Sequence, residues 1–122
     1  MKPSVLTEAE VLPLVAVPEG YSGKVLLLAV TAGSHSWTIL RSGGRWHRDI
    51  LHACETEVHG LGLGQFSLAV RGGAHLRFAD DGSLLIWGQS EEFGACNYRE
   101  VMRLLKTHWP DREIACFWGE IS

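Results

Sequence analysis

The chain has 122 residues, of which 46% are hydrophobic, and its formal net charge is −3 with the histidines neutral. This length suits one domain with its own core, and this hydrophobic fraction excludes a disordered chain. The weakly acidic balance argues against nucleic acid or an anionic membrane as the main partner, although arginines in loops and at helix starts could form a local cationic pocket.

The cysteines and the N-terminus bear on the cellular compartment. Three cysteines form no CxxC pair: Cys54, Cys96 and Cys116. We therefore expect no disulfide framework, and we interpret each cysteine as a small buried side chain in a reducing compartment. Residues 1–10 are interpreted as a loose lead-in without a signal peptide, because Glu8 and Glu10 interrupt any apolar segment. The apolar run 25–30 is too short to cross a bilayer, so we expect a cytoplasmic protein.

The first part of the chain predicts three strands. Residues 11–17 are apolar but contain Pro13, which favours a strand at the edge of a sheet. Residues 24–31 include a continuous apolar run at 25–30, which is typical of a central strand covered on both faces. Residues 36–41 alternate sufficiently to form the next strand.

From about residue 45 to residue 58 the hydrophobic period becomes helical. One arc of this helix holds the apolar side chains Trp46, Ile50, Leu51, Cys54 and Val58. His47 falls near the middle of the arc, so it should face the body of the protein at the first helical turn. Two hypotheses fit this position, namely a core histidine with one hydrogen bond and an acid–base histidine at the floor of a pocket.

The second part of the chain predicts three strands and a helix. These elements are strands at 66–78 and 83–89, a helix at 98–109 and a last strand at 114–118. Residues 71–75 interrupt the first strand, and their double glycine suggests a β-bulge or a group that approaches the backbone closely. Asn97 and Glu100 have the spacing of a capping box at the helix start. The elements together predict one α/β or α+β domain over residues 1–122, with a mixed sheet of about six strands and two helices packed on it.

Residues 88–97 form a loop between a strand and a helix start. Such a loop can turn successive backbone N–H groups toward an anion, although it lacks the Gly-Lys-Ser/Thr of a P-loop. Glu91 and Glu92 would repel phosphate, so their side chains should point outward if the backbone binds an anion. The other histidines and the cysteines show no metal-ligand spacing, and there is no GxSxG motif. We expect neither a metal nor a cofactor.

Six local sequences, taken together and in this order, carry a resemblance. They are Lys24-Val-Leu-Leu-Leu, Leu40-Arg41, Trp46-His47-Arg48-Asp49-Ile50, Arg71-Gly72-Gly73-Ala74-His75, Gly88-Gln89-Ser90-Glu91-Glu92-Phe93-Gly94 and Trp109-Pro110-Asp111-Arg112-Glu113-Ile114. Over roughly residues 24–118 the chain resembles the phosphohistidine phosphatase family, the Janus/Ocnus group. No single motif is specific, but the His-x-Asp-Ile start, the Gly-x-Ser-x-x-aromatic-Gly loop and the Pro-Asp-x-Glu tail are together fairly specific.

The resemblance implies hydrolysis of a phosphorus–nitrogen bond without a metal, typically on phosphohistidine or phospholysine in proteins. His47 matches the family's essential histidine, and Lys24 matches its phosphate-binding lysine. The residues that match the phosphate-binding loop are Ser90, Glu91 and Glu92. The other residues expected at the substrate site are Arg41, Arg45, His75 and Gly94.

Two departures from the family pattern lower the positive potential expected at the site. His75 stands where members often carry an arginine, and the loop, often neutral in the family, has two glutamates. We expect Arg41 and Arg45 to compensate for this loss of positive charge.

These observations lead to three functional hypotheses. The first is a monomeric phosphoramidate phosphatase for a phosphorylated protein or a small phosphoramidate, with His47 as general base or as nucleophile. The second is a non-catalytic domain that binds phosphate or phosphoproteins, which the acidic loop and His75 favour. The third is a purely regulatory interaction protein without an anion pocket, because the Janus branch of the family is associated with development.

Overall fold

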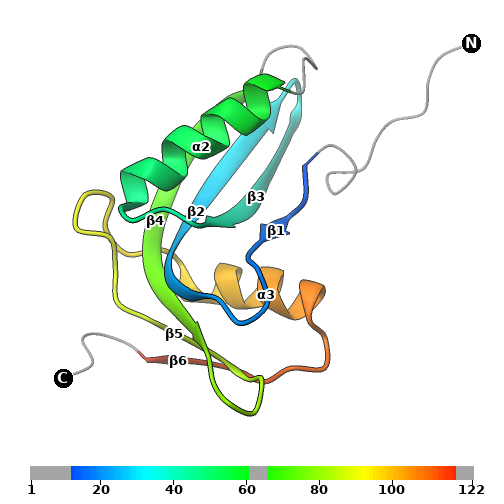
Figure 1. Cartoon of the computed structure of the whole chain (residues 1–122). Coiled ribbons are helices and arrows are strands. Elements are labelled where there is room, and N and C mark those ends of the chain that lie inside the picture. Colours follow the sequence, from blue (N-terminus) through cyan, green and yellow to red (C-terminus); the bar gives the residue numbers. More distant parts are fainter. Residues whose placement is uncertain (1–11, 61–65, 118–122) are drawn as a thin grey trace, which may run out of the picture.

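A computed structural model describes residues 12–60 and 66–117 of the chain (Figure 1). Its elements, in chain order, are β1 (Val15–Ala16), β2 (Ser22–Ala32), β3 (His35–Ser42), α2 (His47–Gly60), β4 (Ser67–Phe78), β5 (Leu84–Trp87), α3 (Tyr98–His108) and β6 (Ile114–Phe117). The strands form one mixed sheet in the order β1-β3-β2-β4-β5-β6, with β1 parallel to β3 and β5 parallel to β6. This arrangement confirms the predicted α+β class with six strands and two helices.

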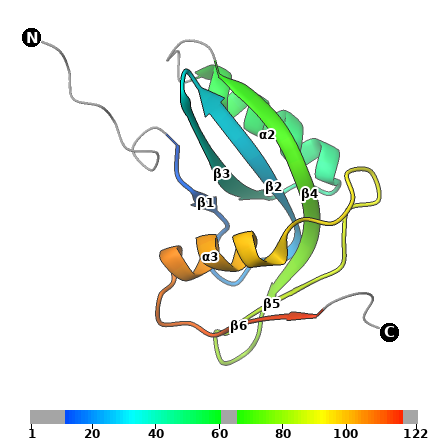
Figure 2. The same cartoon turned by 180° about the vertical axis from the view of Figure 1, so that it is seen from behind.

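The two helices pack on opposite faces of the sheet (Figures 1 and 2). Leu26 and Leu28 of β2 belong to the apolar cluster under α2, whereas Val25 and Leu27 belong to the cluster under α3. The whole run 25–30 is buried, which confirms the predicted central strand. Each fully buried side chain of this size contributes about 1.5–3 kcal/mol to folding.

Strand β4 contains the predicted bulge. Leu28 lies opposite Val70 and Leu26 lies opposite Gly73, so residues 71–72 of β4 together face one residue of β2. The strand continues through this point over Ser67–Phe78, so the predicted interruption at 71–75 is a bulge within one strand and not a break. An unpaired extra residue bends a strand without ending its ladder.

The bulge changes which face of the sheet the even-numbered residues of β4 occupy. Before it, Val70 packs against the cluster under α2, and after it, Ala74 and Leu76 belong to the cluster under α3. His75 consequently lies on the face that α2 occupies, directly opposite Lys24 of β2. The same face continues beyond α2 across β5 and β6, where Phe117 is 44% exposed.

Several predicted element ends differ from the structure. The predicted edge strand 11–17 is confirmed at the edge of the sheet, but it is reduced to Val15–Ala16, between Pro13 and Pro18. Asn97 caps α3 as predicted, because its side-chain oxygen accepts the backbone N–H groups at positions 99 and 100. The Glu100 carboxylate, however, accepts hydrogen bonds from side chains of Arg103 and Thr38.

Some predictions fall outside the described residues. They concern the lead-in at 1–10, the strand start at Val11, the glycine-rich stop at 61–64 and the last predicted strand residue, Trp118. Neither described helix is long and apolar enough to span a membrane.

Candidate functional site

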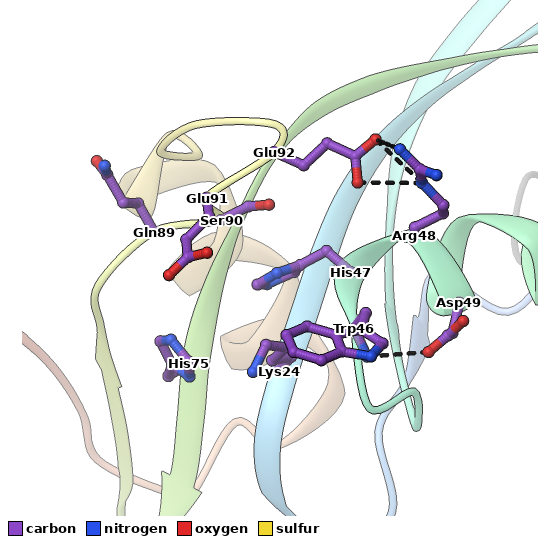
Figure 3. A pocket seen from close by; sticks show the side chains of 10 residues that line it. All are labelled: Lys24, Trp46, His47, Arg48, Asp49, His75, Gln89, Ser90, Glu91 and Glu92. Carbon is purple, nitrogen blue, oxygen red and sulfur yellow. Dashed lines mark hydrogen bonds and ion pairs between the residues drawn. The ribbon is translucent and has the colours of Figure 1, made fainter.

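A pocket of about 410 Å³ lies where the start of α2, the middle of the sheet and the loop after β5 meet (Figure 3). Its lining residues are Lys24, Trp46, His47, Arg48, Asp49, His75, Gln89, Ser90, Glu91 and Glu92. The structure thus brings together six of the nine residues predicted from the sequence. The three that do not line the pocket are Arg41, Arg45 and Gly94.

His47 is buried at the first turn of α2, with 4% of its surface exposed. Its Nε2 lies 3.1 Å from the carbonyl oxygen of Ala74. Because a carbonyl only accepts, Nε2 carries the proton, and in the neutral ring Nδ1 holds the free lone pair. The ring also lies against Gly73, where an added Cβ would be 2.5 Å from Cδ2 and 2.6 Å from Nε2. This contact confirms the close approach expected at the double glycine, and it leaves the Nδ1 edge turned away from β4.

Two histidines with lowered pKa values face each other across the pocket. Burial lowers the pKa of His47 below its ordinary value of 6.5, the hydrogen bond to Ala74 acts in the opposite direction, and the Lys24 charge lowers it further. Burial also lowers the pKa of His75, and Lys24 and His47 add to this effect. Both imidazoles are therefore neutral at pH 7.

The register of the sheet sets the position of His75. It lies opposite Lys24 on one side and opposite Trp87 on the other. Its ring stacks on Trp87 at a centroid distance of 5.6 Å and meets the ring of His47 edge-on at 6.1 Å. A cation and a second imidazole are thus held beside His47 by backbone pairing.

Tyr21 links two parts of the site that are distant in the sequence. Its hydroxyl donates to the carbonyl oxygen of Lys24 at 2.7 Å and accepts the backbone N–H of Gly43 at 3.0 Å. It therefore ties the strand that carries Lys24 to the segment that enters α2. A single tyrosine between two predicted strands gives no signal of this role in the sequence.

The start of α2 explains the His-x-Asp-Ile pattern. The Asp49 carboxylate accepts the backbone N–H of Trp46 at 3.1 Å, which caps the helix and places a negative charge in its first turn. Ile50 is buried in the core. Trp46 precedes the helix, is 56% exposed and lies at the rim of the pocket, with its ring centre 5.7 Å from Lys24 Nζ. Its predicted place on the buried arc is therefore wrong.

Ser90 and Gly94 shape the loop after β5. They exchange backbone hydrogen bonds of 3.1 and 2.9 Å, and the Ser90 hydroxyl accepts the N–H of Phe93 at 3.0 Å. Gly94 has a φ of +79°, which favours glycine, and its carbonyl accepts the N–H of Gly73. Gly94 is thus a residue that holds the loop against β4.

The two glutamates of the loop have different environments. Within the described residues, the backbone N–H groups of Glu91 and Glu92 have no hydrogen-bond acceptor, so they are available to an anion. The Glu92 carboxylate accepts hydrogen bonds from Nη2 and Nε of Arg48 at 2.6 and 3.1 Å, which ties the loop to α2. The Glu91 carboxylate lines the pocket, and Figure 3 shows it extending toward the side where His75 lies. Both glutamates line the pocket, so the expectation that their side chains point outward when the backbone binds an anion finds no support in this loop.

Neither of the two arginines expected to supply positive charge lines the pocket. Arg41 is 4% exposed, and its guanidinium donates to both carboxylate oxygens of Glu57 at 2.8 and 3.0 Å. Arg45 is exposed, and its guanidinium lies 5.6 Å from the ring centre of Trp46. The structure corrects the expectation for Arg41, because Glu57 already neutralises its charge.

The remaining nucleophiles and potential metal ligands lie outside this arrangement. Burial raises the pKa values of Cys54 and Cys96 to about 11, so both thiols stay protonated near neutral pH. Over residues 12–60 and 66–117, no three His, Cys, Asp or Glu side chains are grouped so that they could hold a metal ion. The pocket itself combines a neutral imidazole, an ammonium group and two available N–H groups, which together suit a tetrahedral anion.

Comparison with known proteins agrees with the resemblance in the sequence. A model of the Janus/Ocnus family matches residues 9–113, a range that includes every residue of the pocket. The sex-regulated protein janus-A of Drosophila mauritiana and that of Drosophila simulans are each 30% identical to the chain over 106 residues. These alignments cover 84% of this chain and 76% of each relative.

The contact between Gly73 and His47 can be tested with Gly73→Ala. The added Cβ must displace either the imidazole or β4, so we expect the free energy of unfolding to fall by about 1–3 kcal/mol. The His47 ring signals should also move in NMR spectra. Gly60→Ala is the matched control, because nothing lies within 4 Å of a Cβ at that position. Unchanged stability and unchanged His47 signals in Gly73→Ala would contradict the contact.

The placement of the cations can be tested with Lys24→Gln and Arg41→Gln. Lys24→Gln should weaken phosphate binding about tenfold, as expected when one charge-assisted hydrogen bond is lost. Arg41→Gln should lower the free energy of unfolding by about 1–3 kcal/mol, because it removes the ion pair of Glu57. The phosphate affinity of Arg41→Gln should stay within about twofold of wild type. The substitution leaves the Glu57 carboxylate unpaired, but this partly exposed charge lies outside the lining of the pocket and has little effect at a distance. Calorimetric titration and urea unfolding measure both effects, and the reverse pattern would contradict the placement.

Proposed function

Because the chain belongs to the Janus/Ocnus family, we propose that it is a phosphatase that hydrolyses the phosphorus–nitrogen bond of phosphohistidine or of related phosphoramidates. The observation that carries the proposal is the buried, neutral His47, held through Nε2 with its Nδ1 edge turned away from β4. A histidine in this state is a suitable base beside an anion site.

The phosphoryl group would be held by backbone and cation. The free N–H groups of Glu91 and Glu92 would donate to its oxygens, as in other loops that bind anions through successive amides. Lys24 would supply the positive charge from β2, and His75 would contact the group from β4. This set stabilises charge on oxygens that are already negative in the ground state and stay so during transfer.

His47 would either activate the attacking water or attack phosphorus itself. A phosphorus–nitrogen bond breaks readily once its nitrogen is protonated, so the site has mainly to position the reactants and stabilise charge. As a general base, Nδ1 would take a proton from water while the water oxygen bonds to phosphorus. The phosphorus–nitrogen bond breaks at the same time, and the already protonated leaving group departs with the bonding electron pair, as imidazole from phosphohistidine or as an amine from a simple phosphoramidate. As a nucleophile, Nδ1 would bond to phosphorus while the substrate's phosphorus–nitrogen bond breaks and its imidazole or amine leaves. In a second step, water would attack this phosphorus, break its bond to Nδ1 and release phosphate. In both routes Nε2 keeps its proton and donates it in the hydrogen bond to the carbonyl oxygen of Ala74.

A non-catalytic phosphate-binding domain is the second candidate function. The observation that favours it is the acidic lining of the pocket, in which Asp49, Glu91 and Glu92 all occur. Such a domain would bind phosphate analogues with the same N–H groups and Lys24, but it would release no phosphate from a phosphoramidate.

The decisive assay follows phosphate release from phosphoramidate and from phosphohistidine in the presence of EDTA. His47→Ala should lower kcat/KM at least about a hundredfold, the loss expected for a general base. His52→Ala is the matched control, because this histidine lies on the exposed side of the same helix. If wild type released no more phosphate than His47→Ala does, the phosphatase proposal would be wrong. Binding of phosphate without its release from a phosphoramidate would favour the second candidate.

The pH dependence gives an independent test. Because the pKa of His47 is lowered, its neutral form persists to more acidic pH than that of a free histidine. We expect kcat/KM to rise with pH through an inflection below 6.5 and to level off before neutral pH. A rate that instead falls as pH rises over this range would indicate that protonated His47 is the active form.

A further inference from the structure

The lining of the pocket carries more negative than positive charge. Three carboxylates, those of Asp49, Glu91 and Glu92, stand against the two cations Lys24 and Arg48. With both imidazoles neutral, the formal charge of the lining is therefore −1. This charge is poorly matched to a bare phosphate dianion. It is better matched to a ligand that brings a positive charge of its own next to the phosphoryl group.

The three carboxylates differ in how far they are already satisfied. Asp49 accepts the backbone N–H of Trp46, and Glu92 is bound by two nitrogens of Arg48. Glu91 has no hydrogen bond or ion pair within the described residues, although its side chain lines the pocket. It is therefore the carboxylate that remains available to a ligand.

The position of Glu91 suits contact with the atom that joins the phosphoryl group to the rest of the substrate. Its backbone N–H belongs to the pair available to phosphoryl oxygens, and its carboxylate extends toward the His75 side, away from the Arg48–Glu92 ion pair (Figure 3). One residue can thus present a donor to the oxygens and an anion to a neighbouring atom.

We propose that Glu91 is a specificity-determining residue that recognises a positively charged nitrogen bonded or adjacent to the phosphoryl group. The inference rests on the proposed function and adds the residue that contacts the leaving group of the substrate. Glu91 attracts a cationic nitrogen, and it repels the ester oxygen of an ordinary phosphate monoester, which offers only lone pairs. Selectivity of this kind combines an attractive contact with a repulsive one.

The effect should be modest, because Glu91 is exposed to solvent. An exposed ion pair changes affinity by about 1.5- to fivefold, and salt weakens it. The preference should therefore be largest at low ionic strength and should shrink when salt is added.

Two phosphonates that contain no hydrolysable phosphorus–nitrogen bond provide the test. Aminomethylphosphonate carries an ammonium group next to the phosphonate, and methylphosphonate does not. Their affinities are measured by calorimetric titration at low salt and at a mildly alkaline pH, where both phosphonates are dianionic and the amine is still charged. We expect wild type to bind aminomethylphosphonate about three- to fivefold more tightly. Glu91→Gln should bring this ratio close to one, whereas Glu92→Gln, the neighbouring control, should keep it.

The outcomes separate this inference from the proposed function. A wild-type ratio close to one, or a ratio that survives in Glu91→Gln, overturns the role of Glu91. If Glu92→Gln lowers the ratio of the two affinities as much as Glu91→Gln does, the role of Glu91 is also overturned. The preference would then come from the total negative charge of the loop and not from one carboxylate. Since the phosphonates are not hydrolysed, these results do not depend on turnover. Failure of the phosphatase proposal appears instead as absence of phosphate release from phosphoramidate.

Discussion

One extra residue in β4 determines which side chains of this strand reach the pocket. The bulge at residues 71–72 moves Ala74 into the core under α3 and places His75 on the other face, beside Lys24. In a regular ladder the two positions would exchange faces, because neighbouring residues of a strand alternate. The same short stretch offers bare backbone at Gly73 to the ring of His47. The core and the pocket thus depend on one irregularity in the hydrogen-bond ladder.

The distribution of charge gives the pocket its character. Arg48 is engaged by Glu92, and outside the pocket Arg41 is engaged by Glu57. Lys24 is consequently the cation in the lining that makes no ion pair within the described residues. Among the residues of the lining, an anion would therefore be attracted mainly by Lys24 and by backbone N–H groups, whose positions the loop fixes. Partial charges that the fold fixes in place act without rearrangement, which is the condition for electrostatic stabilisation of a reacting group.

The sequence predicted those features that hydrophobic periodicity and glycine chemistry report. The apolar run at 25–30 predicted the central strand, the helical arc predicted an inward His47, and the double glycine predicted the bulge. The pattern could not identify partners distant in the chain. Arg41 was expected in the pocket because nothing local indicates its pairing with Glu57 on α2. Trp46 was assigned to the buried arc because the helical wheel does not show that the helix starts only at His47.

Helix α2 shelters only part of its face of the sheet. The pocket lies at the first turn of this helix, and beyond it the strand surface continues over Trp87 to the exposed ring of Phe117. A bound group can therefore remain attached to a longer molecule that runs across β5 and β6. Within residues 12–60 and 66–117, α2 leaves this surface beside the pocket open, so the described part of the chain sets no steric limit on what carries the bound group. If the pocket binds such a group, a preference between a small metabolite and a polypeptide would come from attractive and repulsive contacts along that surface.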